Sequence, residues 1–445
     1  MRLASAVSSR PELAERILAG RACVGEQPIR GLRPLMSERL RALREIGALA
    51  GAVIAVEEGA AEHFIAAVLA TWMLDAIPLP CKAAVRTPHS ANFYAVNSSG
   101  RVRPPQESTV LRGLDSTAVL HLTSGSTGVP KLARRGCASV LNEAEGYRLG
   151  LPLGPEDRVY VPVPLAHSYG WGVALGALLA GARVDALPLV NARRAAAQLK
   201  AATVVAITAP IASLLTSVSD STGAPEAGPR IVMVGASRVT ALIDDAFHAR
   251  FGVRLSRNYG SSETGAILMG ATNLPDGAIG LPMHGNTVLA PEPGGEGELR
   301  LALPPVEGHL GSGDQPTVCW STGDLVRRDA DGTVTFVARL RASTRVNDRD
   351  VDVHQLEQVL RRSARVEDVF PLVLPRSDGE TEDLYAVVAG SGIDPASIEQ
   401  HRNTFPDGAQ AVRLVYCEHL PLTATGKVDR AQVIEFIHEW RRSRR

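Results

Sequence analysis

The fold is decided by one stretch of the sequence, Leu122-Thr123-Ser124-Gly125-Ser126-Thr127-Gly128-Val129-Pro130-Lys131. It follows an apolar run, residues 117–122, which is typical of a buried strand. Small residues allow a backbone to approach a ligand closely, and successive N–H groups in such a loop form a concave site for anions. With the positive charge of Lys131, the stretch predicts a loop that holds phosphate. The alternative is an ordinary surface loop rich in serine and glycine.

The stretch does not follow the P-loop pattern of many nucleotide-binding proteins, G-x-x-x-x-G-K-[ST]. Pro130 precedes the lysine and Leu132 follows it, so no glycine sets the turn and no hydroxyl follows to hold magnesium. A P-loop kinase or ATPase is therefore disfavoured. The order of residues instead resembles the signature loop of the adenylate-forming superfamily, which contains acyl- and aryl-CoA synthetases, adenylation domains of peptide synthetases, and luciferases.

Length and charge restrict the class of protein. A chain of 445 residues is too long for one ordinary core and indicates two or three domains. Its 47 Lys and Arg residues balance 47 Asp and Glu residues, which argues against a nucleic-acid partner or an anionic membrane surface. The basic residues 441–445 are typical of a solvated tail.

The sequence also predicts a cytoplasmic protein. Residues 1–20 lack the long apolar segment of a signal peptide. Arg183 and Asp185 interrupt the apolar stretch 170–187, so we expect a buried helix there rather than a membrane span. The five scattered cysteines lack C-x-x-C spacing and predict free thiols in a reducing compartment, with no zinc site.

Apolar strands alternate with helical patterns in the first part of the chain. Helices are expected over residues 37–51 and 58–74, and strands over 52–56 and 76–80, which implies a parallel sheet covered by helices. Residues 273–305 are rich in glycine and proline and predict a small β-subdomain. Further strands are expected at 158–164, 203–208, 230–234 and 252–257.

The pattern changes near Arg339. A helix over 351–364, strands over 366–373 and 384–388, and a closing helix over 431–440 predict an α+β domain of about a hundred residues. The fold class is therefore α/β, with a large N-terminal domain of helix-covered, mainly parallel sheets. We expect this adenylation core at 1–339 and a small C-terminal domain at 340–445. The resemblance implies that the second domain is a mobile lid.

The segment Asn258-Tyr259-Gly260-Ser261-Ser262-Glu263-Thr264 follows an expected strand and resembles a second motif of the superfamily. The resemblance implies that the segment binds ATP, with Tyr259 stacked on adenine and Thr264 touching the α-phosphate. Glu263 would hold Mg²⁺, which prefers carboxylate and phosphate oxygens. The alternative is a turn with a capping glutamate.

Trp320-Ser321-Thr322-Gly323-Asp324 resembles a third motif. Asp324 would accept hydrogen bonds from both ribose hydroxyls, because a carboxylate has several lone pairs. Phe336 and Arg339 stand at the offsets where the family has an apolar residue and an arginine against the ribose. Without that spacing, Thr-Gly-Asp would be an ordinary turn with a capping acid.

A fourth resemblance lies near the end of the chain, where Pro421 to Arg430 follows the family's P-x-T-x-x-G-K-x-x-R pattern. Lys427 would reach the reacting carboxylate and the α-phosphate and would stabilise the charge that develops at phosphorus. The alternative is a solvated surface lysine.

Two more segments are expected to line the carboxylate pocket and the adenine site. His167 stands where the family carries an aromatic residue or histidine at the pocket, and we expect it to be a gate residue; the alternative is a plain buried histidine. The second segment resembles a Gly-Gly-Ala motif, with alanine in place of the second glycine. The residues concerned are Ser168, Tyr169 and Gly170 for the pocket, Val234 and Gly235 for the pocket and adenine, and Ala236 and Ser237 for adenine.

Together these segments predict an ATP- and Mg²⁺-dependent ligase that activates a small or aromatic carboxylate as acyl-AMP and releases pyrophosphate. The resemblance implies transfer to the thiol of CoA or of a phosphopantetheine carrier protein, within bacterial secondary metabolism. Arg341, Arg345 and Asp348 replace the family's usual hinge acid, lysine and glycine, which puts thioester formation in doubt. The alternatives are transfer to nitrogen, including enzymes that activate nitrite, and a catalytically dead nucleotide-binding relative.

Overall fold

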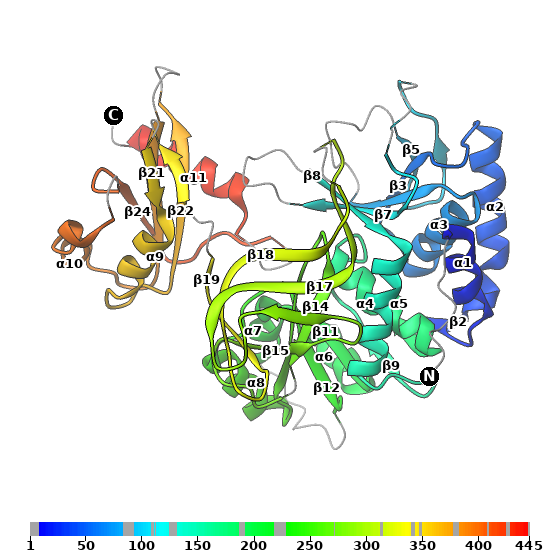
Figure 1. Ribbon diagram of the computed structural model, residues 1–445, viewed down its shortest axis with the longest axis horizontal. Helices are drawn as coiled ribbons and strands as arrows, with labels where there is room; N and C mark the ends of the chain where they lie inside the picture. The colour runs from blue at the N-terminus through cyan, green and yellow to red at the C-terminus, as the bar shows by residue number, and fades with distance from the viewer. Residues whose placement is uncertain are drawn as a thin grey trace. The chain divides into compact units, whose positions relative to one another are not determined.

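The computed structural model (Figure 1) divides into two compact units. The first comprises Met1–Thr322 and Arg327–Phe336, and the second comprises Gly323–Val326 and Val337–Arg445. The roles expected for the parts before and after residue 339 stay predictions. The residues that the structure describes are 9–82, 93–107, 111, 113–123, 131–186, 192–217, 228–270, 272–311, 315–339, 343–346, 349–376, 382–406, 409–423 and 428–443.

A four-stranded sheet lies in the N-terminal part of the first unit. In order it contains β4 (Ile77–Cys81), β3 (Val53–Glu57), β5 (Tyr94–Val96) and β6 (Val102–Arg103). The first three strands run parallel and β6 returns antiparallel. The accompanying helices are α1 (Arg10–Ala19), the 3-10 turn Ile29–Leu32, α2 (Arg33–Glu45) and α3 (Ala61–Met73).

A larger, fifteen-stranded sheet begins with a parallel part. Because all these strands run the same way, the segments that follow their carboxyl ends meet along one edge, where open α/β sheets bind ligands. The strands are, in order, β1 (Cys23–Val24), β10 (Arg183–Asp185), β9 (Arg158–Tyr160), β11 (Val204–Ile207), β12 (Ile231–Val234) and β13 (Leu255–Ser261). The short β2 (Gln27–Pro28) pairs with β1, and the helices here are α5 (Ser168–Ala180), α6 (Ala192–Ala201), α7 (Ala209–Ser217) and α8 (Ala241–Phe251).

The remaining strands of this sheet include several antiparallel pairs. They continue the order as β14 (Gly265–Gly270), β15 (Ala278–Pro282), β19 (Val334–Arg339), β18 (Thr317–Arg328), β17 (Glu296–His309), β8 (Lys131–Gly136) and β7 (Thr117–Thr123), with β16 (Thr287–Ala290) beside β17. Residues 273–305, expected to form a small β-subdomain, contain the short β15 and β16 and most of the 14-residue β17. These strands belong to the same sheet, because β15 pairs with β14.

The main core of the first unit joins the two sheets through aromatic side chains. Trp171 of α5 lies 6.0 Å from Phe64 and 5.8 Å from Trp72, both on α3. Most of α3 is buried, as expected for a helix without a continuous polar face. Helix α4 (Cys137–Gly150) also contributes to this core through Val140, Ala144 and Tyr147. These contacts fix α5, whose first turn carries the expected gate segment.

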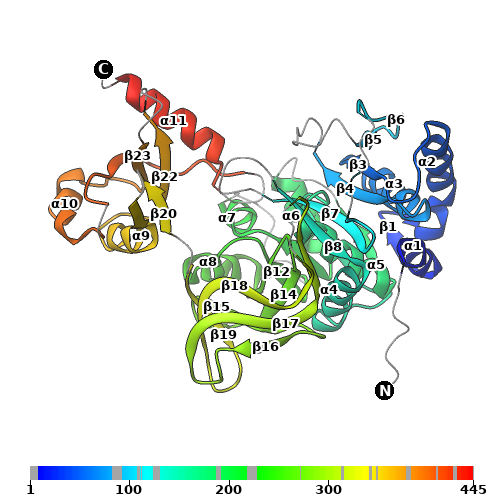
Figure 2. The same ribbon diagram turned by 45° about the horizontal axis from the view of Figure 1, so that its top comes forward.

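The second unit is an α+β domain (Figure 2). Alternate residues of its central strand point to opposite faces: Leu384, Ala386 and Val388 pack in one apolar cluster, and Tyr385 and Val387 in another. Helix α9 (Val353–Arg361) covers the first face and α11 (Arg430–Ser443) covers the second. The other elements are β22 (Asp368–Pro375), β23 (Glu382–Ala389), β24 (Arg413–Cys417), the hairpin β20 (Ser343–Val346) and β21 (Arg349–Asp352), and α10 (Pro395–Glu399).

The α/β fold class expected from the sequence is confirmed, and the boundaries of some elements differ. Helix α2 ends at Glu45, because a glycine at 47 adopts a φ of 81° and turns the chain. Helix α9 begins at Val353, because residues 349–352 pair with β20 instead. The stretch 170–187, expected to be one buried helix, contains the buried α5 and then β10.

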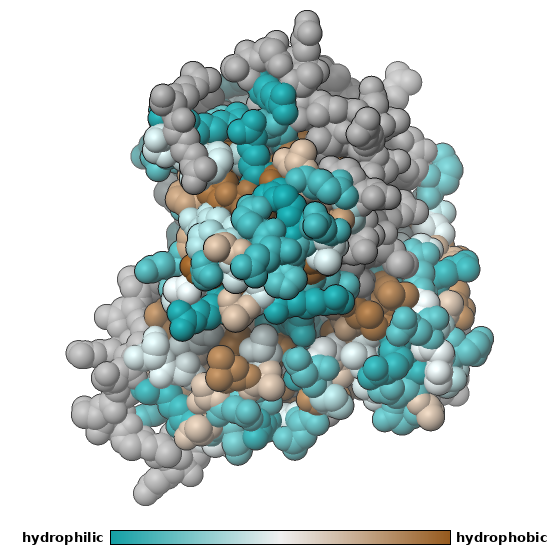
Figure 3. All heavy atoms as spheres, turned by 90° about the vertical axis from the view of Figure 1, so that its left-hand side faces the viewer, coloured by the Kyte–Doolittle hydropathy of each residue, from teal (hydrophilic) through white to brown (hydrophobic). Residues whose placement is uncertain are grey.

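The surface agrees with the balanced composition. On the face drawn in Figure 3, hydrophilic side chains are widely spread, and apolar atoms show in separate patches between them. Among the described residues, no helix combines the length and apolarity that a membrane span requires.

Candidate active site

The predicted phosphate loop closes a β-hairpin. Thr123 ends β7 and Lys131 begins β8, and the two residues are paired across these antiparallel strands. The Thr123 hydroxyl donates to the carbonyl oxygen of Lys131 at 3.4 Å, and the Lys131 side chain is exposed. Residues 124–130, including Ser124 to Gly128, lie outside the described residues. A P-loop leads from a strand into a helix. Here β7 is followed by the antiparallel strand β8, which also disfavours a P-loop protein.

The segment after β12 lies at the carboxyl edge of the parallel strands. The ring of Tyr169 rests against Gly235, since a Cβ on this glycine would lie 2.6 Å from ring atoms. Ala236 has a φ of 59°, a left-handed conformation that strains residues with a Cβ. This explains why the motif that it resembles has glycine there. The Ser237 hydroxyl accepts a hydrogen bond from the N–H of Ala209 at 2.8 Å and so also anchors α7.

The segment 258–264 was expected to follow a strand. Its first part instead lies within one. Strand β13 continues through Asn258, Tyr259 and Gly260 to Ser261, because β14 provides an antiparallel partner that a local sequence pattern does not reveal. At the turn, the N–H groups of Ser261 and Thr264 each donate to the other residue's hydroxyl at 3.3 Å. The buried Thr264 hydroxyl donates to the carbonyl of Gly265 at 2.8 Å. The expected contact of Thr264 with phosphate stays a prediction.

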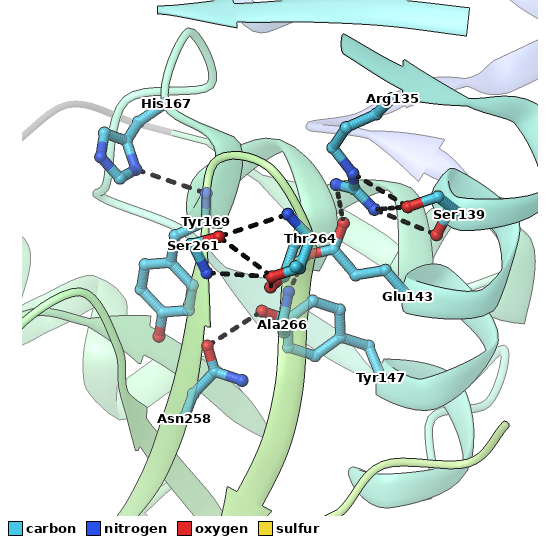
Figure 4. A network of polar contacts seen from close by, with 11 residues as sticks. Arg135, Ser139, Glu143, Tyr147, His167, Tyr169, Asn258, Ser261, Thr264 and Ala266 are labelled. Carbon is cyan, nitrogen blue, oxygen red and sulfur yellow. Dashed lines mark hydrogen bonds and ion pairs between the residues drawn. The ribbon is translucent and has the colours of Figure 1, made fainter. Parts of the chain in front are cut away.

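A buried ion pair lies beneath this turn (Figure 4). Arg135 Nη1 and Glu143 Oε2 are 2.6 Å apart, with side chains 1% and 3% exposed. Glu143 Oε1 accepts from the N–H of Ala266 at 2.8 Å, while Arg135 also donates to Ser139. Gly265 has a φ of 71°, and a Cβ there would lie 2.6 Å from both Arg135 and Glu143. The sequence analysis missed this pair, because no recognised motif joins the two residues.

Two tyrosines occupy the space beside the expected carboxylate pocket. Tyr147 of α4 donates to Asn258 Oδ1 at 3.2 Å, and Tyr169 of α5 donates to the carbonyl of Met233 at 3.1 Å. Burial raises the pKa of both phenols, so both remain neutral donors. Ser168 and Gly170 are buried beside Tyr169 at the start of α5. A fixed aromatic ring therefore lies against Gly235, where the carboxylate pocket is expected.

Glu263 is suited to a metal ion. Its Oε1 lies 2.9 Å from His309 Nε2. Burial opposes ionisation, but hydrogen bonds from His309 and Ser261 outweigh it and lower the pKa of Glu263 to about 2. The described residues contain no group of three or more His, Cys, Asp or Glu side chains that could form a complete metal site. A single ionised carboxylate fits Mg²⁺, which commonly binds one or two carboxylates together with substrate phosphates and water.

His167 caps the first turn of α5. Its Nδ1 accepts from the N–H of Tyr169 at 3.3 Å, so the neutral ring carries its proton on Nε2. The turn before it is held by Glu58, whose Oε1 accepts from the N–H of Leu165 at 2.5 Å. Burial raises the pKa of Glu58, although the N–H groups of Leu165 and Ala166 and the charge of Lys82 oppose this rise. The sequence analysis did not identify Glu58, because it contacts this turn only in the folded chain.

The remaining predicted residues lie on β18, on β19 or outside the described residues. Asp324 lies within β18 and is 1% exposed, and Phe336 lies half-buried in β19. The Thr-Gly-Asp segment is thus part of a strand rather than an isolated turn. Of Arg339 the structure describes the backbone, at the end of β19, and Lys427 lies outside the described residues. Within the first unit, Figure 4 shows His167, Tyr169, Asn258, Ser261 and Thr264 in one neighbourhood.

Comparison with known proteins agrees with the resemblance that the motifs indicate. Residues 86–304 match the family model described as AMP-binding enzyme. Over 353 residues, or 70% of this chain, it is 25% identical to triostin synthetase I of Streptomyces triostinicus. Over 373 residues, or 75% of this chain, it is 27% identical to the 2-hydroxy-7-methoxy-5-methyl-1-naphthoate–CoA ligase of Streptomyces carzinostaticus. The chain is thus similar to AMP-binding enzymes and ligases of the adenylate-forming superfamily, as its motifs predicted.

One solved structure shares its fold with nearly the whole chain. The crystal structure of ATP-bound MatB from Rhodopseudomonas palustris superposes with a TM-score of 0.74, covering 96% of this chain and 98% of that one, at 18% identity. This likeness shows the fold. In sequence, the matches cover 64% of the length of both Streptomyces relatives.

Proposed function

We propose that this member of the adenylate-forming superfamily is an ATP-dependent ligase that activates a small or aromatic carboxylate as acyl-AMP. The observation that carries the proposal is that the superfamily's three functional charges, Glu263, Asp324 and Lys427, all stand in their motifs. Glu263 also has an environment that keeps it ionised. These charges argue against a catalytically dead relative that only binds a nucleotide.

In the proposed reaction, a carboxylate oxygen of the substrate attacks the α-phosphorus of ATP. The bond from that phosphorus to the bridging oxygen breaks, and pyrophosphate leaves. This step needs alignment and neutralisation of charge more than covalent help from the protein. We assign the β- and γ-phosphates to the loop 123–131, Mg²⁺ to Glu263, the ribose to Asp324 and the developing charge to Lys427. Bound Mg²⁺ would neutralise phosphate charge.

The activated acyl group then passes to an acceptor. The leading acceptor is the thiol of CoA or of a carrier protein, as in the CoA ligases that the chain resembles. A nitrogen nucleophile is the second candidate. It is favoured by Asp348, which stands where the superfamily usually has glycine in the segment that approaches the thiol. An aspartate there adds bulk and a negative charge.

The proposed compartment is the cytoplasm. The five cysteines are free, and burial raises the pKa of Cys81 to about 12 and that of Cys137 to about 11. Neutral, buried thiols of this kind behave as small apolar side chains and fit a reducing environment.

The test is a panel of carboxylates assayed for release of pyrophosphate from ATP, repeated with CoA, amines and nitrite. A kinase or ATPase would release ADP, and a nucleotide-binding relative would release neither product. Lys427→Ala should lower the rate of pyrophosphate release about 10²–10³-fold while ATP binding is mostly kept, because the charge acts on the transition state. A wild-type rate in Lys427→Ala would remove this assignment.

A further inference from the structure

A cavity of about 300 Å³ lies in the first unit, outside the residues expected to bind ATP. It is formed by the residues that directly follow four parallel strands, β3 and β4 of the small sheet and β9 and β10 of the large one. The carboxyl ends of parallel strands are the usual ligand-binding edge of α/β sheets. Its volume is at the lower end of the range for ligand pockets and suits a small molecule.

Among the described residues, the lining of this cavity contains one acid and one base together with mainly apolar groups. The acid is Glu58, after β3, and the base is Lys82, after β4. Each residue directly follows one of two paired strands, since β3 and β4 pair up to Glu57 and Cys81. Both line the cavity, and the charge of Lys82 acts on the Glu58 carboxyl. The apolar walls come from Val161, Val163 and Leu165.

This charge arrangement selects among small molecules. A simple amine would be attracted by Glu58 but repelled by Lys82. A simple carboxylate would be attracted by Lys82 but repelled by Glu58. A zwitterion satisfies both charges, and an apolar side chain can fill the remaining walls. We propose that the cavity binds an amino acid with an apolar side chain, its ammonium group at Glu58 and its carboxylate at Lys82, and that this amino acid is the acceptor of the activated acyl group.

The position of Glu58 connects this cavity with the expected reaction site. The same carboxylate that lines the cavity holds the N–H of Leu165, two residues before the gate residue His167. An ammonium group bound at Glu58 therefore acts on the turn that carries His167. The inference rests on the proposed function and takes its second acceptor class, nitrogen.

The proposed transfer is an aminolysis. The ammonium group first loses a proton to water, and the nitrogen then attacks the carbonyl carbon of the acyl-AMP. The C–N bond forms, the bond from that carbon to the phosphate oxygen breaks, and AMP leaves with the electron pair. A second proton passes from nitrogen to water, which leaves an N-acyl amino acid.

Direct binding tests the cavity without relying on the ligase activity. We would titrate the whole protein by calorimetry with leucine, with 3-methylbutylamine, which lacks the carboxylate, and with 4-methylpentanoate, which lacks the ammonium group. Leucine should bind about tenfold or more tightly than either analogue, because each charged contact contributes separately. Equal binding of leucine and one analogue would overturn the assignment of the other charge.

Matched variants locate the ligand. Glu58→Gln retains an oxygen that can accept from Leu165 but removes the charge, and Lys82→Gln removes the opposite charge. Each should weaken leucine binding about tenfold. Glu57→Gln, one residue earlier and outside the cavity lining, should leave it unchanged. Wild-type affinity in both Glu58→Gln and Lys82→Gln would place leucine elsewhere and overturn the proposal.

Product analysis then tests the acceptor role. With a carboxylate that supports pyrophosphate release, leucine should yield an N-acyl leucine, detected by mass spectrometry, at a rate lowered in both cavity variants. Pyrophosphate release with leucine as the sole acid would show that the amino acid is itself adenylated and would overturn the acceptor role. So would leucine binding without acyl transfer. If no acid releases pyrophosphate, the proposed function fails, and the calorimetry still decides what the cavity binds.

Discussion

At the scale of single residues, Glu263 shows how a buried site can keep a charge. Its carboxylate is removed from much of the solvent, which by itself would favour the protonated form. His309 and Ser261 donate hydrogen bonds to the ionised form and reverse the balance, so that the pKa falls to about 2. The residue expected from the motif to hold Mg²⁺ thus meets a requirement that the motif alone does not guarantee.

This pKa predicts a pH dependence of stability. Because the folded pKa of Glu263 lies below its ordinary value of 4.5, the ionised carboxylate stabilises the fold above pH 4.5, and this contribution is lost as the pH falls toward 2. Glu263→Gln should therefore reduce the free energy of unfolding in urea at pH 7, with a difference from wild type that shrinks below pH 4.5. The exposed Glu292→Gln serves as a control and should show little effect. A difference that stays constant with pH would contradict the assigned pKa.

Asp324 predicts an effect on nucleotide affinity. Its side chain is buried within β18, and the proposed ribose contacts would be charge-assisted hydrogen bonds. Asp324→Ala should weaken ATP binding by roughly 1.5–3 kcal/mol for each lost bond. Calorimetry with ATP measures this, and circular dichroism of the same sample establishes that the variant is folded. Unchanged ATP affinity in a folded variant would mean that Asp324 has only a structural role in β18.

Single residues also show where sequence reasoning stops. Residue types within motifs identified Glu263 and His167 as candidates, because their chemistry is local to the motif. Glu58 and Arg135 were missed, because their partners Leu165 and Glu143 are brought to them only by the fold. The sequence shows that Ala236 replaces a glycine of the motif that it resembles. Only the structure shows that this alanine adopts a left-handed conformation.

At the scale of elements, the Arg135–Glu143 pair joins three pieces of the first unit. Arg135 belongs to β8, Glu143 to α4, and the N–H that Glu143 also binds belongs to Ala266 of β14. The pair therefore ties β8, the strand after the expected phosphate loop, to the turn at Thr264. The orientation of that turn depends on a charge whose partner is fully buried.

Breaking this pair should be costly. Glu143→Ala leaves Arg135 charged and buried without its partner, and we expect a loss of about 3–5 kcal/mol in the free energy of unfolding. Glu145→Ala is the matched control on the same helix, because its bonds to Arg16 and Arg148 involve partly exposed side chains; it should cost about 1 kcal/mol or less. Urea denaturation measures both. Similar losses of unfolding free energy in the two variants would show that the buried pair stabilises the fold no more than the partly exposed pairs do.

Helices and strands were predicted well where an apolar helix face or a continuous apolar run determines the secondary structure. The run 117–122 became β7, and the strands expected near 204 and 231 became β11 and β12. The extension of β13 through Tyr259 and the strand around Asp324 were not predicted, because polar, glycine-containing segments take strand conformation only when a neighbouring strand pairs with them.

At the scale of the whole molecule, the chain divides into two compact units, and the second comprises Gly323–Val326 together with Val337–Arg445. The sequence predicts a domain boundary near Arg339, since a new set of helix and strand periods begins there. The superfamily resemblance implies that the second unit turns after adenylation, withdraws Lys427 and presents the segment around residue 348 instead. Of the three departures, Arg345 lies in β20 of the second unit, and Arg341 and Asp348 lie outside the described residues.

The last prediction concerns that segment and separates the two half-reactions. An aspartate brought into a narrow tunnel loses hydration unless it finds a partner, which is costly. Arg341 or Arg345 could supply the partner, and the carboxylate would then suit an amine better than a thiolate. Asp348→Gly should leave pyrophosphate release nearly unchanged and should increase thioester formation with CoA relative to amide formation, both measured by mass spectrometry. Efficient acyl-CoA formation by the wild type, slowed by Asp348→Gly, would instead show that the segment already serves a thiol.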